Sequence, residues 1–107
     1  MPKASELRSM LRLERERDEL DQFGELQRKW VEVARVWSKV EESAAGERTI
    51  GGKKRAIVRA RILCRWRSGV LTTDRLMFGA LVYNIEGVTD FEADRKRWLV
   101  IDAVRMD

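Results

Sequence analysis

The sequence predicts a small all-β fold, an antiparallel barrel or sandwich, and three observations support this. Apolar and charged side chains alternate from residue 58 to residue 67, and this period of two gives a strand one apolar face. Ser68-Gly69 then ends the strand with turn residues, and Gly79 permits a second bend. The run from Leu81 to Val88 that follows is rich enough in β-branched and aromatic residues to form another strand.

The secondary structure of the first 25 residues is less clearly predicted by the sequence. Residues 1–9 are polar, with one proline, and are predicted to form an N-terminal arm. The apolar positions between Met10 and Arg17 fit either a strand or a helix. Residues 18–25 contain Phe23-Gly24 among acidic side chains and are predicted to form a turn.

The segment from Leu26 to Glu42 carries two conflicting signals. Its apolar residues recur at helical spacing and would form a continuous stripe along one helix face. Its four valines and two tryptophans are instead typical of a strand. From the residues alone, both structures stay open.

Two connecting segments and a last strand are predicted in the rest of the chain. Residues 41–55 are small and glycine-rich, so we expect a loop of about fifteen residues, a length at which loops usually have a function. A short helix over residues 42–49 is the alternative. Residues 87–96 are predicted to form a hairpin-like connection, with Gly87 in a bulge. Residues 97–104 form a strand that is apolar on both faces, which suggests that one face contacts a partner.

The single cysteine and the absence of histidine exclude most catalytic and metal-binding chemistry. One thiol, Cys64, allows no disulfide within the chain, which fits a reducing compartment. Neither a nucleophile–base pair nor a Cys/His metal cluster can be assembled. The alternating carboxylates of Asp90, Glu92 and Asp94 lack the glycine and closing glutamate of a calcium loop and are interpreted as a solvated turn. We therefore expect one domain over residues 1–107 that is not an enzyme and has no cofactor or metal.

The net charge of +4 is unevenly distributed along the chain. Residues 48–67 hold eight basic and no acidic side chains, whereas the segments before and after this block have a small acidic excess. Such a block contacts either nucleic acid or acidic surfaces of neighbouring subunits. No apolar run approaches the roughly 20 residues that a membrane helix requires, so we expect no membrane partner. A signal-peptide pattern is also lacking.

A pattern of residues from position 65 to position 88 resembles a known family. Further matches lie at Phe23 and at the tryptophans 30, 37 and 98, so that the similarity extends from about residue 11 to residue 104. The residues that carry the pattern are Arg65, Gly69, Asp74, Arg75, Gly79, Tyr83, Ile85 and Val88. They resemble the pattern of the head–tail adaptor or head-closure proteins of long-tailed phages and gene-transfer particles, also described as stopper or head–tail joining proteins.

This resemblance implies a strand over residues 26–42, about five strands in total, and a long loop between the second and third strands. It also implies a structural virion protein, assembled in the host cytoplasm, that forms a ring of about twelve copies at the head–tail junction. By the same resemblance, we expect the ring to close the DNA-filled head and to connect the portal or adaptor proteins to the tail terminator or other tail proteins. We also expect the long loop, residues 41–55, to point towards the packaged double-stranded DNA in the channel.

Two groups of basic residues are then assigned different partners. We expect Lys53, Lys54 and Arg55 in the loop to face the channel and its DNA. The second group lies on a strand and is expected to contact acidic segments of a neighbouring subunit; it consists of Arg59, Arg61, Arg65 and Arg67. Asp74 is predicted to cap its turn, and Arg75 to pair with a neighbouring strand or subunit. The alternative is a stand-alone nucleic-acid-binding β-barrel protein that uses the same four arginines, with Trp66 stacking on bases.

Overall fold

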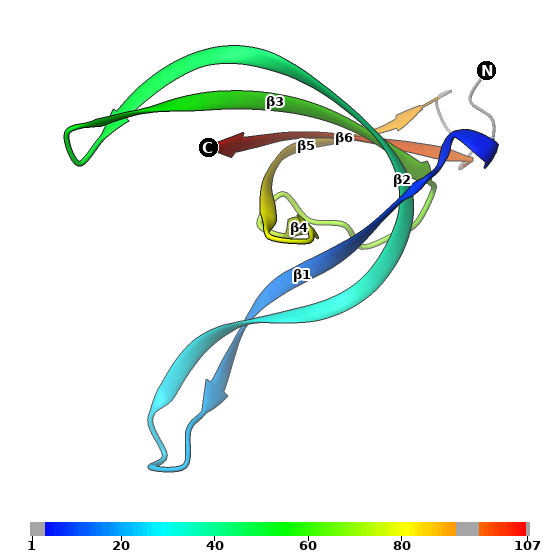
Figure 1. The fold of residues 1–107 in the computed structure, drawn as a ribbon. Coiled ribbons are helices and arrows are strands. Elements are labelled where there is room, and N and C mark those ends of the chain that lie inside the picture. The colour runs from blue at the N-terminus through cyan, green and yellow to red at the C-terminus, as the bar shows by residue number, and fades with distance from the viewer. Residues whose placement is uncertain (1–3, 92–96, 107) are drawn as a thin grey trace.

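A computed structural model describes residues 4–91 and 97–106 of the chain. Six antiparallel strands form a closed barrel in the order β1-β2-β3-β6-β5-β4 (Figure 1). The all-β prediction is therefore confirmed. Among the described residues no helix is long and apolar enough to cross a membrane. The elements are a short 3-10 turn at Ala4–Glu6, followed by β1 Ser9–Leu20, β2 Leu26–Ile50, β3 Lys53–Arg65, β4 Arg75–Phe78, β5 Leu81–Phe91 and β6 Trp98–Met106.

The second strand is much longer than the sequence predicts. Residues 26–42 form a strand, as the family resemblance implies, but β2 continues without interruption to Ile50. The prediction of a long loop over residues 41–55 is therefore wrong, as is the alternative of a short helix. Only Gly51-Gly52 connects β2 to β3, and both glycines have positive φ, 57° and 78°, which suits a two-residue hairpin turn. The small residues before them stay in the sheet because β3 satisfies their backbone hydrogen bonds.

The short strand β4, which lies between the two expected turns at Gly69 and Gly79, closes the barrel. β4 pairs with β5 through four residue pairs and with β1 through three, Arg12↔Met77, Leu13↔Leu76 and Glu14↔Arg75. This adds a sixth strand to the expected five. The predicted bulge at Gly87 is confirmed by a register shift between Ile85 and Gly87. Bulges of this kind increase local strand curvature, which a small barrel requires.

The interior of the barrel is filled by one apolar cluster. Its members come from every strand except β2, whose Val33, Val36 and Val40 are partly buried and pack against the cluster. Alternation along β3 places Ile62 and Cys64 inside and the arginines outside, as the period of two predicts. The buried cluster consists of Leu11, Leu13, Ala60, Ile62, Cys64, Leu76, Tyr83, Ile85, Leu99, Ile101 and Ala103.

Two hairpins extend beyond the barrel as two-stranded ribbons and diverge from each other (Figure 1). β2 changes partner at Ser38: residues 26–38 pair with β1, and residues from Ser38 onwards pair with β3. Because β4 flanks β1 only as far as Glu14, residues 15–31 form a free ribbon, called here the β1–β2 arm. β6 flanks β3 only as far as Ile57, so residues 47–56 form a second free ribbon, the β2–β3 arm.

Two ion pairs cross the short seam between β1 and β4. Arg75 Nε donates to Glu14 Oε1 at 2.9 Å. Arg15 binds Asp74 with both ends of its guanidinium, Nε to Oδ1 at 2.8 Å and Nη2 to Oδ2 at 2.9 Å. The Asp74 side chain is completely buried and also accepts the Leu71 N–H at 2.9 Å. The seam therefore combines three strand pairs with an Arg–carboxylate contact of the strong, bidentate kind.

The protonation of Asp74 follows from these contacts. Burial by itself would raise the pKa of its carboxyl group. The hydrogen bonds from Arg15 and Leu71, together with the Arg15 charge, outweigh burial, so the pKa lies below its ordinary value of 3.8. A carboxyl group whose pKa is lowered by folding stabilises the folded state above its unfolded pKa, and this contribution is lost as the pH falls through the folded pKa.

We predict that Asp74→Ala lowers the free energy of unfolding by about 2 kcal/mol, because the Leu71 N–H and the Arg15 guanidinium lose their acceptor. Urea denaturation at pH 7 measures this difference. Arg28→Ala on the β1–β2 arm is the matched control, because it removes only ion pairs between exposed side chains, which contribute little. With Asp74→Asn, the difference from the wild type should shrink as the pH falls below about 4. A difference that is constant down to pH 2 would contradict the assigned role of the Asp74 charge.

A second prediction concerns the barrel interior. Burial raises the pKa of the Cys64 thiol to about 11, against a weaker opposing effect of the Arg67 charge. At pH 8 the folded chain should therefore react with a thiol reagent only as fast as it unfolds, whereas the chain in denaturant should react at once. Rapid, complete labelling of the folded chain would show that the β3 face carrying Cys64 is not inside the barrel.

Candidate interaction surfaces

The described part of the chain offers several exposed surfaces with distinctive chemistry. Among residues 4–91 and 97–106, no three His, Cys, Asp or Glu side chains lie where they could hold a metal ion. Of the three carboxylates interpreted as a solvated turn, Asp90 lies near the end of β5, and Glu92 and Asp94 lie outside the described residues. The surfaces with distinctive chemistry are the tips of the two arms and the outer face of β3.

The tip of the β2–β3 arm concentrates positive charge. Lys53, Lys54 and Arg55 lie at the start of β3, and the hairpin register places Arg48 directly opposite Arg55. All four side chains are exposed, and none of them forms an ion pair within the described part of the chain. Glu47 is the single acidic residue of this arm, so its net charge is +3. Directly opposed like charges destabilise a ribbon, and a bound anion would relieve their repulsion.

The arm holds this charge away from the barrel wall. A bulge between Ala44 and Gly46 marks its root, where Gly46 has a φ of 112° that other residues rarely adopt. Beyond the root only the two strands of the ribbon pair with each other. Exposed ammonium and guanidinium groups on such a ribbon suit a phosphate backbone, which requires charge but no fixed geometry.

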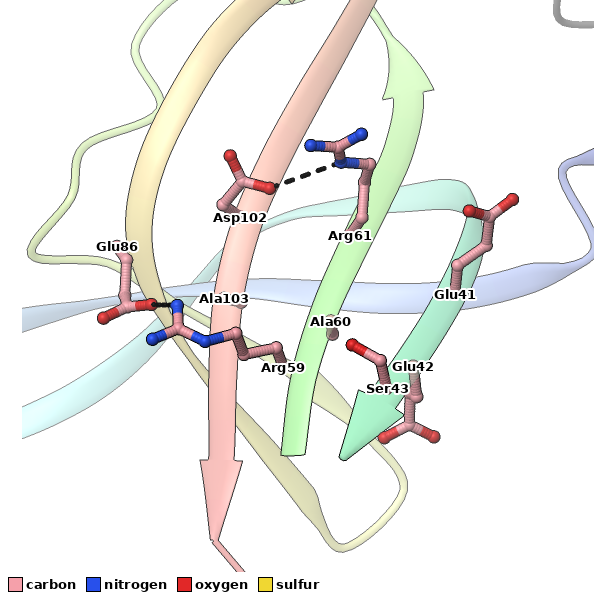
Figure 2. A pocket seen from close by; sticks show the side chains of 9 residues that line it. All are labelled: Glu41, Glu42, Ser43, Arg59, Ala60, Arg61, Glu86, Asp102 and Ala103. Carbon is pink, nitrogen blue, oxygen red and sulfur yellow. Dashed lines mark hydrogen bonds and ion pairs between the residues drawn. The ribbon is translucent and has the colours of Figure 1, made fainter. Parts of the chain in front are cut away.

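Two of the β3 arginines, Arg59 and Arg61, form ion pairs within their own chain. Arg59 Nη1 lies 3.2 Å from Glu86 Oε1, and Arg61 Nε lies 3.6 Å from Asp102 Oδ1 (Figure 2). Both arginine side chains are still 65% and 69% exposed, so these ion pairs contribute little stability. They line an open groove of about 540 Å³ on the outside of the sheet, formed by Glu41, Glu42, Ser43, Arg59, Ala60, Arg61, Glu86, Asp102 and Ala103.

Of the other two arginines assigned to the subunit interface, Arg65 lies on the outer face of β3 with Arg59 and Arg61, and Arg67 does not. Arg65 is exposed on the same face of β3, and its guanidinium carbon lies 5.5 Å from the centre of the Trp98 ring. That distance fits a cation–π contact. Arg67 follows the end of β3, and its Nε is buried without a hydrogen-bond partner. The structure thus brings Arg59, Arg61 and Arg65 together and separates Arg67 from them.

The tryptophans do not form a platform for stacking bases. Trp98 is 8% exposed, and Trp66 packs against the barrel core. The Trp30 ring lies under the Arg75 guanidinium at 4.2 Å, at the root of the β1–β2 arm. Trp37 is exposed. Three of the four indoles therefore have structural contacts, and the stacking that the nucleic-acid-binding alternative requires is not assembled.

The remaining motif residues lie around the β1–β4 seam. Gly69, with a φ of 81°, presents its carbonyl oxygen to Arg15 Nη2. Gly79 opens the two-residue turn between β4 and β5, with a φ of 59°. Tyr83 and Ile85 are buried in the core, and burial together with the Glu42 charge raises the pKa of the Tyr83 hydroxyl.

Two features with functional consequences were missed from the sequence. Arg15 binds Asp74 across 59 residues, and no local pattern indicates such a contact. The tip of the β1–β2 arm carries exposed Leu20, Phe23 and Leu26. The sequence does indicate this apolar tip, because a Phe-Gly turn flanked by two leucines is unusual in an otherwise charged segment.

Comparison with known proteins identifies the family. Residues 2–106 match the sequence profile of the phage head completion proteins. The chain belongs to this family. A chain from the virion of a native gene transfer agent particle has a similar fold, with a TM-score of 0.75 and 24% identity, and the match covers 100% of this chain and 98% of the other. Protein SF1141 from Shigella flexneri 2a is also similar, with a TM-score of 0.67, 22% identity and coverage of 97% and 96%. A comparison with curated proteins gave no match.

Membership of this family confirms the resemblance to head-closure proteins that the sequence shows. The chain is a structural protein of a virion that takes part in head completion, and it is not an enzyme. The virion context implies association with other head and tail proteins. The exposed arms and the outer β3 face are the candidate surfaces for such contacts.

Proposed function

We propose that the chain forms a closed ring at the head–tail junction, where it closes the DNA-filled head and connects the portal or adaptor proteins to the tail. The family supports a role in head completion, and the two diverging arms of the barrel support contacts in two directions. A ring requires each copy to present two different surfaces to its two neighbours. The outer face of β3 and the β1–β2 arm are distinct surfaces of this kind.

The observation that carries the proposal is the unpaired positive charge at the tip of the β2–β3 arm. Double-stranded DNA carries one negative charge per roughly 1.7 Å of helix axis, so phosphate contacts need no particular base sequence. In a ring, every copy directs one such tip into the channel, and weak individual contacts add up. Lys53, Lys54 and Arg55, with Arg48 opposite, would therefore hold the DNA end without reading its sequence.

The β3 arginines fit the subunit interface better than the channel. Arg59 and Arg61 lie on the barrel wall in ion pairs with Glu86 and Asp102, which reduces their attraction for DNA. Because these pairs are exposed, exchanging a partner for a carboxylate of the neighbouring copy would cost little. The stand-alone nucleic-acid-binding alternative is less well supported, since it needs these arginines free and the tryptophans exposed.

We predict that replacing Lys53, Lys54 and Arg55 together with Ser leaves ring formation and tail docking intact but lowers DNA retention. The tip would keep only Arg48 to contact phosphates, while the barrel wall would be unchanged. Electron microscopy of particles assembled with the variant measures the fraction of heads that stay filled on storage. The matched control exchanges lysine and arginine at the same three positions, which keeps the charge, and it should retain DNA like the wild type.

The companion variant Arg59→Ser with Arg61→Ser should instead reduce the number of particles that contain a complete ring. The opposite pattern, in which the tip variant fails to assemble and the wall variant assembles but leaks DNA, would reverse the two assignments. Equal DNA retention by the tip variant and the wild type would remove the channel role of the β2–β3 arm.

A further prediction concerns the isolated chain, which should bind DNA weakly and without sequence preference. The slope of log affinity against log salt is about −0.9 per phosphate contact, so the four basic residues of the tip allow about −3.6 at most. Fluorescence anisotropy with a short duplex measures this slope, and the triple Ser variant should lose most of it. A steeper slope that survives the triple replacement would favour the nucleic-acid-binding alternative.

A further inference from the structure

The tip of the β1–β2 arm is apolar and exposed. Leu20 and Leu26 face each other across the last pair of the ribbon, and Phe23 lies in the turn between them. Their exposed fractions are 69%, 72% and 80%. Three large apolar side chains gathered at the end of a projecting ribbon are typical of an interaction site rather than of a solvated turn.

Hydrogen bonds hold the backbone of the turn that carries Phe23 in a defined conformation. Asp21 Oδ1 accepts the N–H groups of Phe23 at 2.8 Å and of Glu25 at 2.9 Å. The Asp21 backbone also bonds to Glu25 and to Gly24, at 2.8 Å and 3.0 Å. Gly24 has a φ of 80°, which glycine adopts at low cost. Because the conformation exists before binding, little entropy is lost when the tip docks.

The charge of the tip is as distinctive as its apolar content. Residues 18–27 include four acidic and no basic side chains. Asp18 and Glu19 are paired with Arg28 and Lys29 of the facing strand. The other two acidic residues, Asp21 and Glu25, form no ion pair within the described part of the chain. A complementary surface would therefore combine an apolar floor with basic side chains at its rim.

The barrel wall of the same chain provides an apolar floor with both basic and acidic side chains at its rim. The strand registers align Lys39, Leu63, Val100 and Thr89 in one row across β2, β3, β6 and β5. They line an open groove of about 310 Å³, called here the Leu63 groove, together with Glu41, Arg61 and Asp102. Leu63 and Val100 form the apolar floor. Arg61 and Arg65 lie on either side of Leu63 along the outer face of β3.

We propose that the β1–β2 tip of one copy docks in the Leu63 groove of the next copy. Phe23 packs on Leu63 and Val100, and the carboxylates of Asp21 and Glu25 face Arg61 and Arg65. The tip and the groove belong to different parts of the molecule, so the contact is heterologous and can repeat around a closed ring. This inference rests on the proposed ring and names the surfaces that form its subunit interface.

Cysteine cross-linking in assembled particles tests the contact directly. Phe23→Cys combined with Val100→Cys should give a ladder of disulfide-linked oligomers on a non-reducing gel, because a disulfide needs Cβ atoms about 4 Å apart. The native Cys64 can stay in place, since it is 1% exposed. Each single variant should give no ladder. The decoy pair Leu71→Cys with Val100→Cys, which uses an exposed residue away from the tip, should give none either.

The outcomes separate this inference from the proposed function. Particles that show a ring in electron micrographs but give no ladder on the gel would overturn the contact between tip and groove. The proposed ring itself would be unaffected. A cross-link from Phe23→Cys to itself or to another virion protein would also overturn it. Absence of any ring would overturn both. As a second readout, Phe23→Ala should lower the yield of complete rings at least about tenfold, whereas Gln22→Ala in the same turn should not, with unfolding temperatures unchanged in both.

Discussion

The buried contact between Arg15 and Asp74 is the constraint on which the rest of this structure depends. It lies beside a seam of only three residue pairs, and that seam makes the six strands a closed barrel rather than an open sheet. Arg15 is also the first residue of the β1–β2 arm, and the Arg75 that follows Asp74 covers Trp30 on the opposite strand of the arm. The same short segment therefore closes the barrel and fixes the direction in which the arm leaves it.

The two arms use the same ribbon architecture for different chemistry. Charges along the β1–β2 stem are largely paired with one another, and its tip is apolar and acidic. The four basic side chains of the β2–β3 arm form no ion pair within the described part of the chain, and Glu47 is the one acidic residue of the arm. An isolated two-stranded ribbon is marginally stable in water, so contacts with partners would add to the stability of both arms. A protein partner suits the first composition and a phosphate backbone suits the second.

Much of the fold could be predicted from local patterns, but the long-range contacts could not. Alternation over residues 58–67 identified β3 and its buried face, because burial on one side of a sheet imposes that period. Gly51-Gly52 supports either a flexible loop or a tight hairpin, and only pairing with β3 selects the hairpin. Lys53, Lys54 and Arg55 were recognised as a cluster from composition alone. Three ion pairs could not be predicted, because they depend on strand register and topology, which no single segment encodes. They join Arg15 to Asp74, Arg59 to Glu86 and Arg61 to Asp102.

We propose that the two arms face different partners in the assembled virion. A cryo-electron microscopy reconstruction of the head–tail junction, at a resolution that separates strands, would test this. We expect a closed ring in which the tips at Gly51-Gly52 point into the channel beside DNA density and the tips at Phe23 contact the wall of the adjacent copy. A ring whose Phe23 tips line the channel while Lys53 and Lys54 lie between subunits would contradict it.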